Sequence, residues 1–100
     1  KTIVWFDFNQ LCQIPRSQLD YLAIAKKFNT VFISNIPFIQ PSNTVSITYF
    51  INLIDILYDQ HIKLIFSAET TIEALYISGD KFFEYQRTLS RLHEMNSQQY

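Results

Sequence analysis

Two arginines on the last predicted helix are the residues whose type and spacing point most directly to chemistry. Arg87 and Arg91 are four residues apart, so they are surface neighbours on a helix over 81–95. Two guanidinium groups on one face suit a phosphate, or a carboxylate from another domain or subunit. The alternative is a solvated face on which Arg87 pairs with Glu84 and Arg91 pairs with Glu94, each at a spacing of three.

A second set of polar residues follows the predicted strands. Asp7, Asn35 and Glu69 each lie at or just beyond the end of a strand, and ligands of parallel sheets gather beyond the carboxyl ends of the strands. Carboxylate and amide oxygens are ligands that Mg²⁺ accepts, which makes a small free-standing hydrolase site one hypothesis. The alternative is ordinary loop entry, because strand-end polar residues occur in most α/β domains.

The histidines and the cysteine give weaker indications. Neither His61 nor His93 has a partner at a metal-ligand spacing, and a histidine such as His93 near a helix C-terminus interacts favourably with the helix dipole. Cys12 is the only cysteine, which excludes a disulfide framework and a cysteine-rich metal site. We expect Cys12 to be a small buried hydrophobic residue, and we expect these 100 residues to hold no metal or cofactor by themselves.

Composition excludes several kinds of binding site. Gly79 is the only glycine among 100 residues, whereas a Walker A loop or a dinucleotide fingerprint needs several glycines so that backbone N–H groups can approach phosphate. The net charge of -1 provides no basic field for nucleic acid, so we expect no nucleic-acid partner. The aromatic residues, 16% of the chain, are not interleaved with basic ones and indicate core packing.

The elements that must position these residues alternate between strand and helix. Apolar and β-branched runs predict strands at 2–8, 30–36 and 63–68; helical spacing predicts helices at 17–29, 42–59 and 81–95, with a short helix near 70–76. This β-α-β-α-β-α order is typical of an α/β domain with a small three-stranded, mainly parallel sheet covered by helices. The near-continuous apolar strands predict burial on both faces of that sheet.

Local signals set the boundaries of these helices. A turn is expected near 14–16, and Ser17 and Asp20 have the spacing of a capping box. Pro37 and Pro41 predict an extended loop after the second strand. The helix over 42–59 is apolar beyond a single stripe, so we expect other elements to cover it on two sides. No segment approaches the roughly 20 apolar residues of a membrane span, and none reads as a signal peptide.

Short segments spread over nearly the whole chain form a recognisable pattern. They are Trp5-Phe6, Leu11-Cys12, Asp20-Tyr21-Leu22, Thr30-Val31, Pro37, Phe50-Ile51, Leu53-Ile54-Asp55, Leu57-Tyr58-Asp59, Lys63-Leu64-Ile65, Ser67-Ala68-Glu69, Gln86-Arg87-Thr88, Ser90-Arg91-Leu92 and Glu94-Met95. In this order they resemble the C-terminal region of the ZapE-type, AFG-like P-loop ATPases of bacterial cell division and of mitochondria. Two positions depart from the family pattern. Tyr49 stands where many members have arginine, and Asn35 where aspartate is usual, so roles at these positions are not carried over.

The resemblance implies that residues 1–100 are a single C-terminal α/β domain of a larger ATPase. Walker A and Walker B segments that bind ATP and Mg²⁺ are then expected upstream of Lys1. In ring-forming P-loop ATPases an arginine commonly reaches the γ-phosphate, in cis or from a neighbouring subunit. Arg87 and Arg91 are the matching residues of this chain.

The resemblance also implies a cellular role. The full protein would couple ATP hydrolysis to cell division or protein quality control, whereas these 100 residues alone would be inactive. Expected partners are the upstream ATPase core, neighbouring subunits and a cell-division or membrane-associated protein, in the cytoplasm or at the periphery of the inner membrane. The alternative is a noncatalytic protein-interaction module that docks a partner, and a Walker A segment upstream of Lys1 would distinguish the two.

Overall fold

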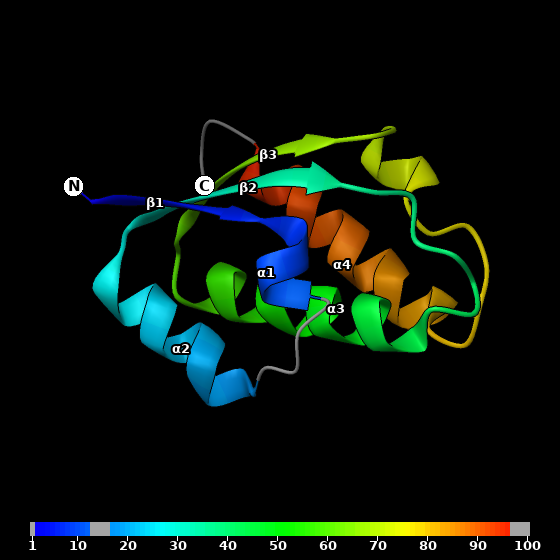
Figure 1. Ribbon diagram of the computed structural model, residues 1–100, viewed down its shortest axis with the longest axis horizontal. Helices are drawn as coiled ribbons and strands as arrows, with labels where there is room; N and C mark the ends of the chain where they lie inside the picture. The colour runs from blue at the N-terminus through cyan, green and yellow to red at the C-terminus, as the bar shows by residue number, and fades with distance from the viewer. Residues whose placement is uncertain (1, 13–16, 97–100) are drawn as a thin grey trace.

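The chain folds into two layers, a three-stranded sheet and a layer of helices packed against one of its faces (Figure 1). The computed structural model describes residues 2–12 and 17–96. Along the chain, the elements are β1 (Ile3–Asp7), α1 (Phe8–Cys12), α2 (Gln18–Lys27), β2 (Thr30–Ile36), α3 (Thr44–Asp59), β3 (Lys63–Ala68), the 3-10 helix η1 (Ile72–Ala74) and α4 (Phe82–Met95). The predicted turn near 14–16 lies outside the described residues.

The sheet has the strand order β1-β2-β3, and both pairings are parallel. This confirms the predicted fold class, an α/β domain with a small parallel sheet. Crossover connections between parallel strands are nearly always right-handed, so two successive crossovers in the same direction place their helices on the same face. Figure 1 shows this arrangement, with α1, α2, α3 and α4 all below the sheet.

Burial on both faces of the sheet was predicted, and this prediction is wrong for the described residues. Side chains that point toward the helices are buried, as at Val31, Ile33 and Leu64. On the opposite face, Trp5 is 67% exposed and Ile65 is 40% exposed. One set of side chains fills the core, and the alternating set points outward, where the large apolar residues Trp5, Phe32 and Ile65 stand among polar ones.

Helix α1 was not predicted, because the first strand was expected to run through Phe8 and break at Asn9. The strand instead ends at Asp7, and Phe8 is the first residue of the helix. A carboxylate oxygen of Asp7 accepts a hydrogen bond from the Asn9 backbone N–H at 3.1 Å, and the Gln10 side chain accepts one from the Asp7 backbone N–H at 2.8 Å. These bonds resemble a capping box, except that Asp7 caps the second helical residue rather than the third, and the spacing Asp-x-x-Gln was a readable signal for them.

Among the other helices, a cap was predicted only for α2, and the structure confirms it. Ser17 and Asp20 form the expected capping box at the start of α2. Helix α3 begins at Thr44 rather than near Ser42, because the Asn43 side chain accepts a hydrogen bond from the Ser46 backbone N–H at 3.2 Å and fixes the boundary. The extended loop predicted from the two prolines precedes it. None of the described helices is both long and apolar enough to cross a membrane.

Helix α3 lies at the centre of the helical layer. It contacts α1, α2 and α4, which confirms that elements cover it on more than one side. Its buried residues come from more than one stripe, as the prediction required; they are Ser46, Ile47, Phe50, Ile51, Leu53, Ile54 and Leu57. Cys12 is fully buried in the same core, as predicted.

The segment before α4 is less helical than predicted. Only residues 72–74 form a single 3-10 turn, where a short helix was expected over 70–76. The turn at 78–80 is present, and Gly79 has a φ of 134°, a conformation that side chains rarely adopt. Helix α4 then presents Tyr85 and Leu92 to the core, and the Tyr85 hydroxyl donates a hydrogen bond to the Ile72 carbonyl at 2.7 Å.

Candidate functional site

The two arginines predicted as a site lie on the side of α4 that faces α3, and both reach the same carboxylate. The nearest Arg91 guanidinium nitrogen is 2.5 Å from Asp55 Oδ1, and that of Arg87 is 3.5 Å from Asp55 Oδ2. Asp55 belongs to α3, so these contacts join residues 32 and 36 positions apart in the sequence. Among the described residues neither arginine pairs with Glu84 or Glu94, so the predicted pairs within α4 are not the ones formed.

Arg91 is held by two side chains of α3. Besides its bond to Asp55, its guanidinium carbon lies 4.8 Å from the centre of the Tyr58 ring, a cation–π contact. The Tyr58 hydroxyl donates a hydrogen bond to Glu94 Oε1 at 2.8 Å, and this bond raises the pKa of Tyr58 above its ordinary value. The side chain of Arg91 is only 26% exposed. These contacts fix its position between α3 and α4.

Arg87 is much less constrained. Its side chain is 59% exposed, and its contact with Asp55 is a long one at 3.5 Å. It lines a shallow pocket of about 140 Å³ between the first halves of α3 and α4. The other lining residues are Thr48, Ile51, Asn52, Asp55, Lys81 and Glu84. Arg87 is therefore held less tightly than Arg91.

Sequence reasoning missed Asp55 and Tyr58, although a signal was available. The two residues are three apart on α3, and Arg87 and Arg91 are four apart on α4. Each pair therefore occupies neighbouring positions on one helix face, and the two faces have complementary chemistry. The sequence does not show that α3 and α4 lie side by side. Without that knowledge, the complementary faces of the two helices do not predict a contact.

The predicted strand-end residues come together only in part. The Asn35 side-chain amide donates a hydrogen bond to Asp7 Oδ1 at 2.8 Å, and this bond, followed by the one from the Asn9 backbone, lowers the pKa of Asp7. Asn35 has a φ of 60° at a register shift between β2 and β3. Its backbone N–H donates to Ser67 Oγ at 3.0 Å.

Glu69 serves a structural role at the same end of the sheet. Its carboxylate accepts a hydrogen bond from the Phe38 backbone N–H at 2.9 Å and so holds the loop after β2. It lines an open pocket of about 340 Å³ together with Asn35, Ile36, Pro37, Ser67 and Ala68. No group of three or more metal-ligating side chains of the His, Cys, Asp and Glu types occurs in residues 2–12 and 17–96. The magnesium-dependent hydrolase site remains a prediction.

The two histidines lie near the ends of α3 and α4. His93 Nε2 is 2.7 Å from Glu73 Oε2, which links α4 to η1. His61 follows α3 with a φ of 56°, and its backbone N–H donates to the Tyr58 carbonyl at 3.1 Å. Both positions have structural explanations in the turns and pairs that they form.

Comparison with known proteins assigns the family. The family model described as AFG1-like ATPase matches residues 1–100, the whole chain. The chain belongs to the AFG1-like ATPase family. This confirms the resemblance seen in the sequence segments.

The relatives of this AFG1-family chain are much longer than it is. The chain is 42% identical over 94 residues to "Cell division protein ZapE" of Escherichia coli strain K12, covering 93% of the chain and 25% of that relative. It is 32% identical over 124 residues to an uncharacterised protein of Schizosaccharomyces pombe (96% and 27%) and 29% identical over 131 residues to "Lactation elevated protein 1 homolog B" of Danio rerio (99% and 26%). The chain therefore spans about a quarter of the length of these relatives. No solved structure matches it.

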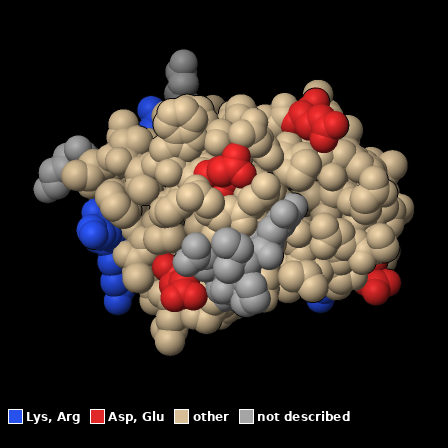
Figure 2. Space-filling view, viewed as in Figure 1, with Lys and Arg blue, Asp and Glu red and all other residues tan. Residues whose placement is uncertain are grey.

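The described residues of this AFG1-family chain include no glycine-rich loop of the kind that cradles the phosphates of a nucleotide. The only glycine, Gly79, is in a turn where an added Cβ would lie 2.1 Å from the Tyr76 hydroxyl, so it opens no cradle for phosphate. Charged atoms on the face shown in Figure 2 are dispersed, with basic side chains mainly at one edge and no broad basic patch. Tyr49, where many family members have arginine, is partly buried and packs against the core.

Proposed function

We propose that these residues form the C-terminal α/β part of an AFG1-family ATPase and supply an arginine to a nucleotide held elsewhere in the protein. The ATP and Mg²⁺ of such a protein would be bound by Walker segments outside these 100 residues. The name of the Escherichia coli relative supports a role in cell division, and protein quality control is the other role to be tested. A cytoplasmic location, with contacts to neighbouring subunits and a division or membrane-associated partner, belongs to the same proposal.

The observation that carries the proposal is the difference between the two arginines. Arg91 is fixed by Asp55 and Tyr58, whereas Arg87 has one long contact and a side chain that is 59% exposed. We assign the phosphate contact to Arg87 and a positioning role to Arg91. Asp55 holds both guanidinium groups in the absence of nucleotide, and an incoming phosphate would compete with it only for the weakly held one.

ATP turnover of the full-length protein tests this assignment. For Arg87→Ala we expect kcat to fall by about 10³-fold, the low end of the range for an arginine that stabilises the transition-state charge of phosphoryl transfer. The melting temperature should stay near that of the wild type because the surface ion pair is weak. The neighbouring exposed residue provides a control, and Gln86→Ala should leave kcat unchanged.

The alternative function, a noncatalytic interaction module, makes the opposite prediction. It is favoured by the exposed apolar side chains of Trp5 and Ile65 on the outer face of the sheet. If the protein is such a module, Arg87→Ala leaves turnover unchanged while partner binding is lost. Unaltered kcat in a folded Arg87→Ala protein would therefore refute the arginine assignment.

A further inference from the structure

The face of the sheet opposite the helices carries a row of large apolar side chains. Trp5, Phe32 and Ile65 are aligned by the parallel register, one from each strand. Trp5 is 67% exposed and Ile65 is 40% exposed. The Trp5 and Phe32 rings are stacked with their centres 5.1 Å apart. The row crosses the full width of the sheet.

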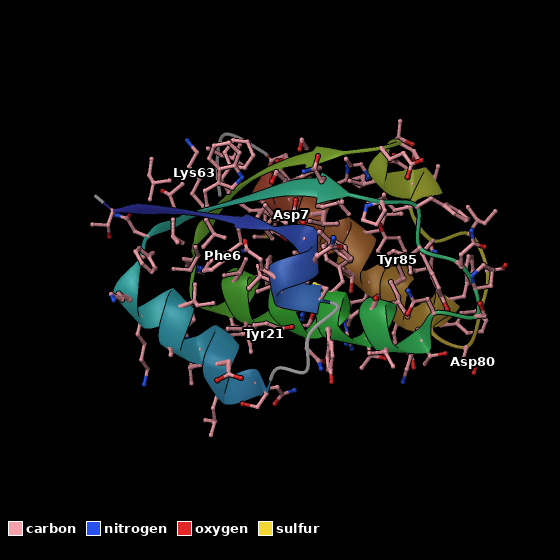
Figure 3. All side chains as sticks on the ribbon, viewed as in Figure 1. Phe6, Asp7, Tyr21, Lys63, Asp80 and Tyr85 are labelled. Atoms are coloured by element: carbon pink, nitrogen blue, oxygen red, sulfur yellow. The ribbon has the colours of Figure 1, made fainter. Side chains whose placement is uncertain are left out.

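The row itself is apolar, and polar side chains border it toward both ends of the strands. The Trp5 indole N–H donates a hydrogen bond to Ser34 Oγ at 2.8 Å, so this donor is already satisfied within the sheet. Ile3, two residues before Trp5, is 68% exposed and extends the apolar surface toward the start of β1. Lys63 aligns with Thr30 at that end, and Figure 3 shows it on the side of the sheet away from the helices, whereas Phe6 points toward them.

No crossover within the described chain can cover this face. The order β1-β2-β3 has two successive parallel crossovers, and their shared handedness sends both helical connections to the other side. All-parallel sheets occur almost only with both faces covered. An exposed apolar row of this kind therefore marks an interaction surface that needs a second layer from another segment.

We propose that the row Trp5, Phe32, Ile65 is the docking surface for an apolar helical layer supplied by the remainder of the same ATPase polypeptide. This inference rests on the proposed function, that the chain works as one part of a longer AFG1-family protein. The relatives have room for such a layer, since this chain spans only 25% of the length of the Escherichia coli one.

A tethered layer is favoured over a second copy of the chain by its effective concentration. A segment joined through a short flexible linker is present at an effective concentration in the range of about 10⁻³ M. A separate copy at micromolar concentration competes with it at a large disadvantage. The occupant is therefore expected to come from the same molecule.

Trp5 itself provides the test, because it is the only tryptophan in these 100 residues. Its fluorescence in the full-length ATPase is obtained as the difference between the wild type and Trp5→Phe, and acrylamide quenching measures its accessibility. We expect quenching several-fold weaker than for a free tryptophan analogue. As a matched control, Leu19 is 76% exposed on α2, so Leu19→Trp in the Trp5→Phe background should be quenched strongly.

A second pair of variants serves if Trp5→Phe does not fold. Ile65→Thr keeps a β-branched side chain but makes it polar, and on a covered face it should lower the melting temperature by roughly 2–4 °C. Ile77→Thr makes the same chemical change at a residue that is 58% exposed in the loop before α4. That control should leave the melting temperature unchanged.

Three outcomes would overturn the proposal. Trp5 would be as accessible as the tryptophan at position 19, or Ile65→Thr would be as harmless as Ile77→Thr. Alternatively, Trp5 would become shielded only as the protein concentration and the molar mass rise together, which would make a second copy the occupant. None of these measurements depends on ATP turnover, so a failed arginine assignment and a failed docking surface give different results.

Discussion

Arg87 and Arg91 show how two residues of the same type on one helix acquire different roles. They are four positions apart and share one carboxylate, Asp55. Their difference comes from Tyr58, which lies under the Arg91 guanidinium and is itself anchored by Glu94. A stacked, two-sided contact immobilises Arg91, whereas Arg87 keeps most of its side chain in solvent. Exposure and packing, not charge, distinguish the two arginines.

The different roles predict different losses of stability. Arg91→Ala should lower the free energy of unfolding by about 1–2 kcal/mol, because it removes the cation–π contact and leaves a partly buried Asp55 carboxylate without its closest partner. Arg87→Ala should cost less than about 0.5 kcal/mol, as expected for an exposed ion pair. Urea unfolding measures both values.

Arg91→Lys provides the matched control for this comparison. Lysine keeps the charge but lacks the planar fork that stacks on Tyr58 and bonds to Asp55. Its loss of stability should lie between those of the two alanine variants. Equal losses for Arg87→Ala and Arg91→Ala would show that Arg91 has no special positioning role.

At the scale of the elements, Asp7 joins a strand, a helix and a neighbouring strand. It ends β1, caps α1 through the Asn9 backbone N–H, and accepts the side-chain amide of Asn35 from the end of β2. Both bonds favour the carboxylate and lower its pKa below the ordinary value. The stability of the junction between β1, α1 and β2 therefore depends on whether Asp7 is protonated.

The lowered pKa of Asp7 predicts that the folded protein loses stability in acid. A carboxyl group with a lowered pKa in the folded state contributes stability above its unfolded pKa, about 3.9, and loses it as the pH falls through the folded value. Asp7→Asn keeps an oxygen that can cap α1 but removes the titration. Urea unfolding between neutral pH and about pH 3 should show a smaller loss of stability for Asp7→Asn than for the wild type. Parallel curves would contradict the coupling.

At the scale of the whole molecule, one core holds both layers together. The buried side chains of α1, α2, α3 and α4 and of the inner sheet face form a single cluster. Cys12 is fully buried in it, and burial raises the pKa of this thiol to about 12. Because the core is continuous, Cys12 should become accessible only when the whole domain opens.

Thiol labelling of Cys12 tests whether the core opens only as a single unit. At about pH 8 we expect native Cys12 to react with a disulfide reagent orders of magnitude more slowly than the unfolded chain, because the thiolate is the reactive form. Its rate in mild urea should follow the global unfolding equilibrium. Ser90, exposed on α4, provides the control: Ser90→Cys in a Cys12→Ala background should react at once. Equal rates would mean that α1 opens separately.

The same raised pKa predicts the direction of an alkaline effect. The folded state binds the thiol proton more tightly than the unfolded state does. Stability from this group is therefore complete below the unfolded pKa of about 8.5 and declines as the pH rises above it. Cys12→Ala should remove this decline.

Much of the fold was predictable because its signals are local. The strand over 63–68, the capping box of α2 and the end of α3 at Asp59 depend on residues close together in the sequence. The helix α1 was missed because its five residues are too few to show a helical period, although its capping signal was readable. A short helix was predicted over 70–76, but only one 3-10 turn forms there. Apolar spacing does not decide whether so short a segment continues as a helix.

The candidate site, too, was predictable only where its signals are local in the sequence. The sequence by itself determined that Arg87 and Arg91 are neighbours on one helix, that a chain with one glycine has no Walker A loop, and which family the segments resemble. Only the tertiary structure decided that Asp55 and Tyr58 of α3 meet these arginines, and that Trp5 faces outward. Helical and strand periods fix which residues share a face, but the packing of distant elements fixes what each face meets.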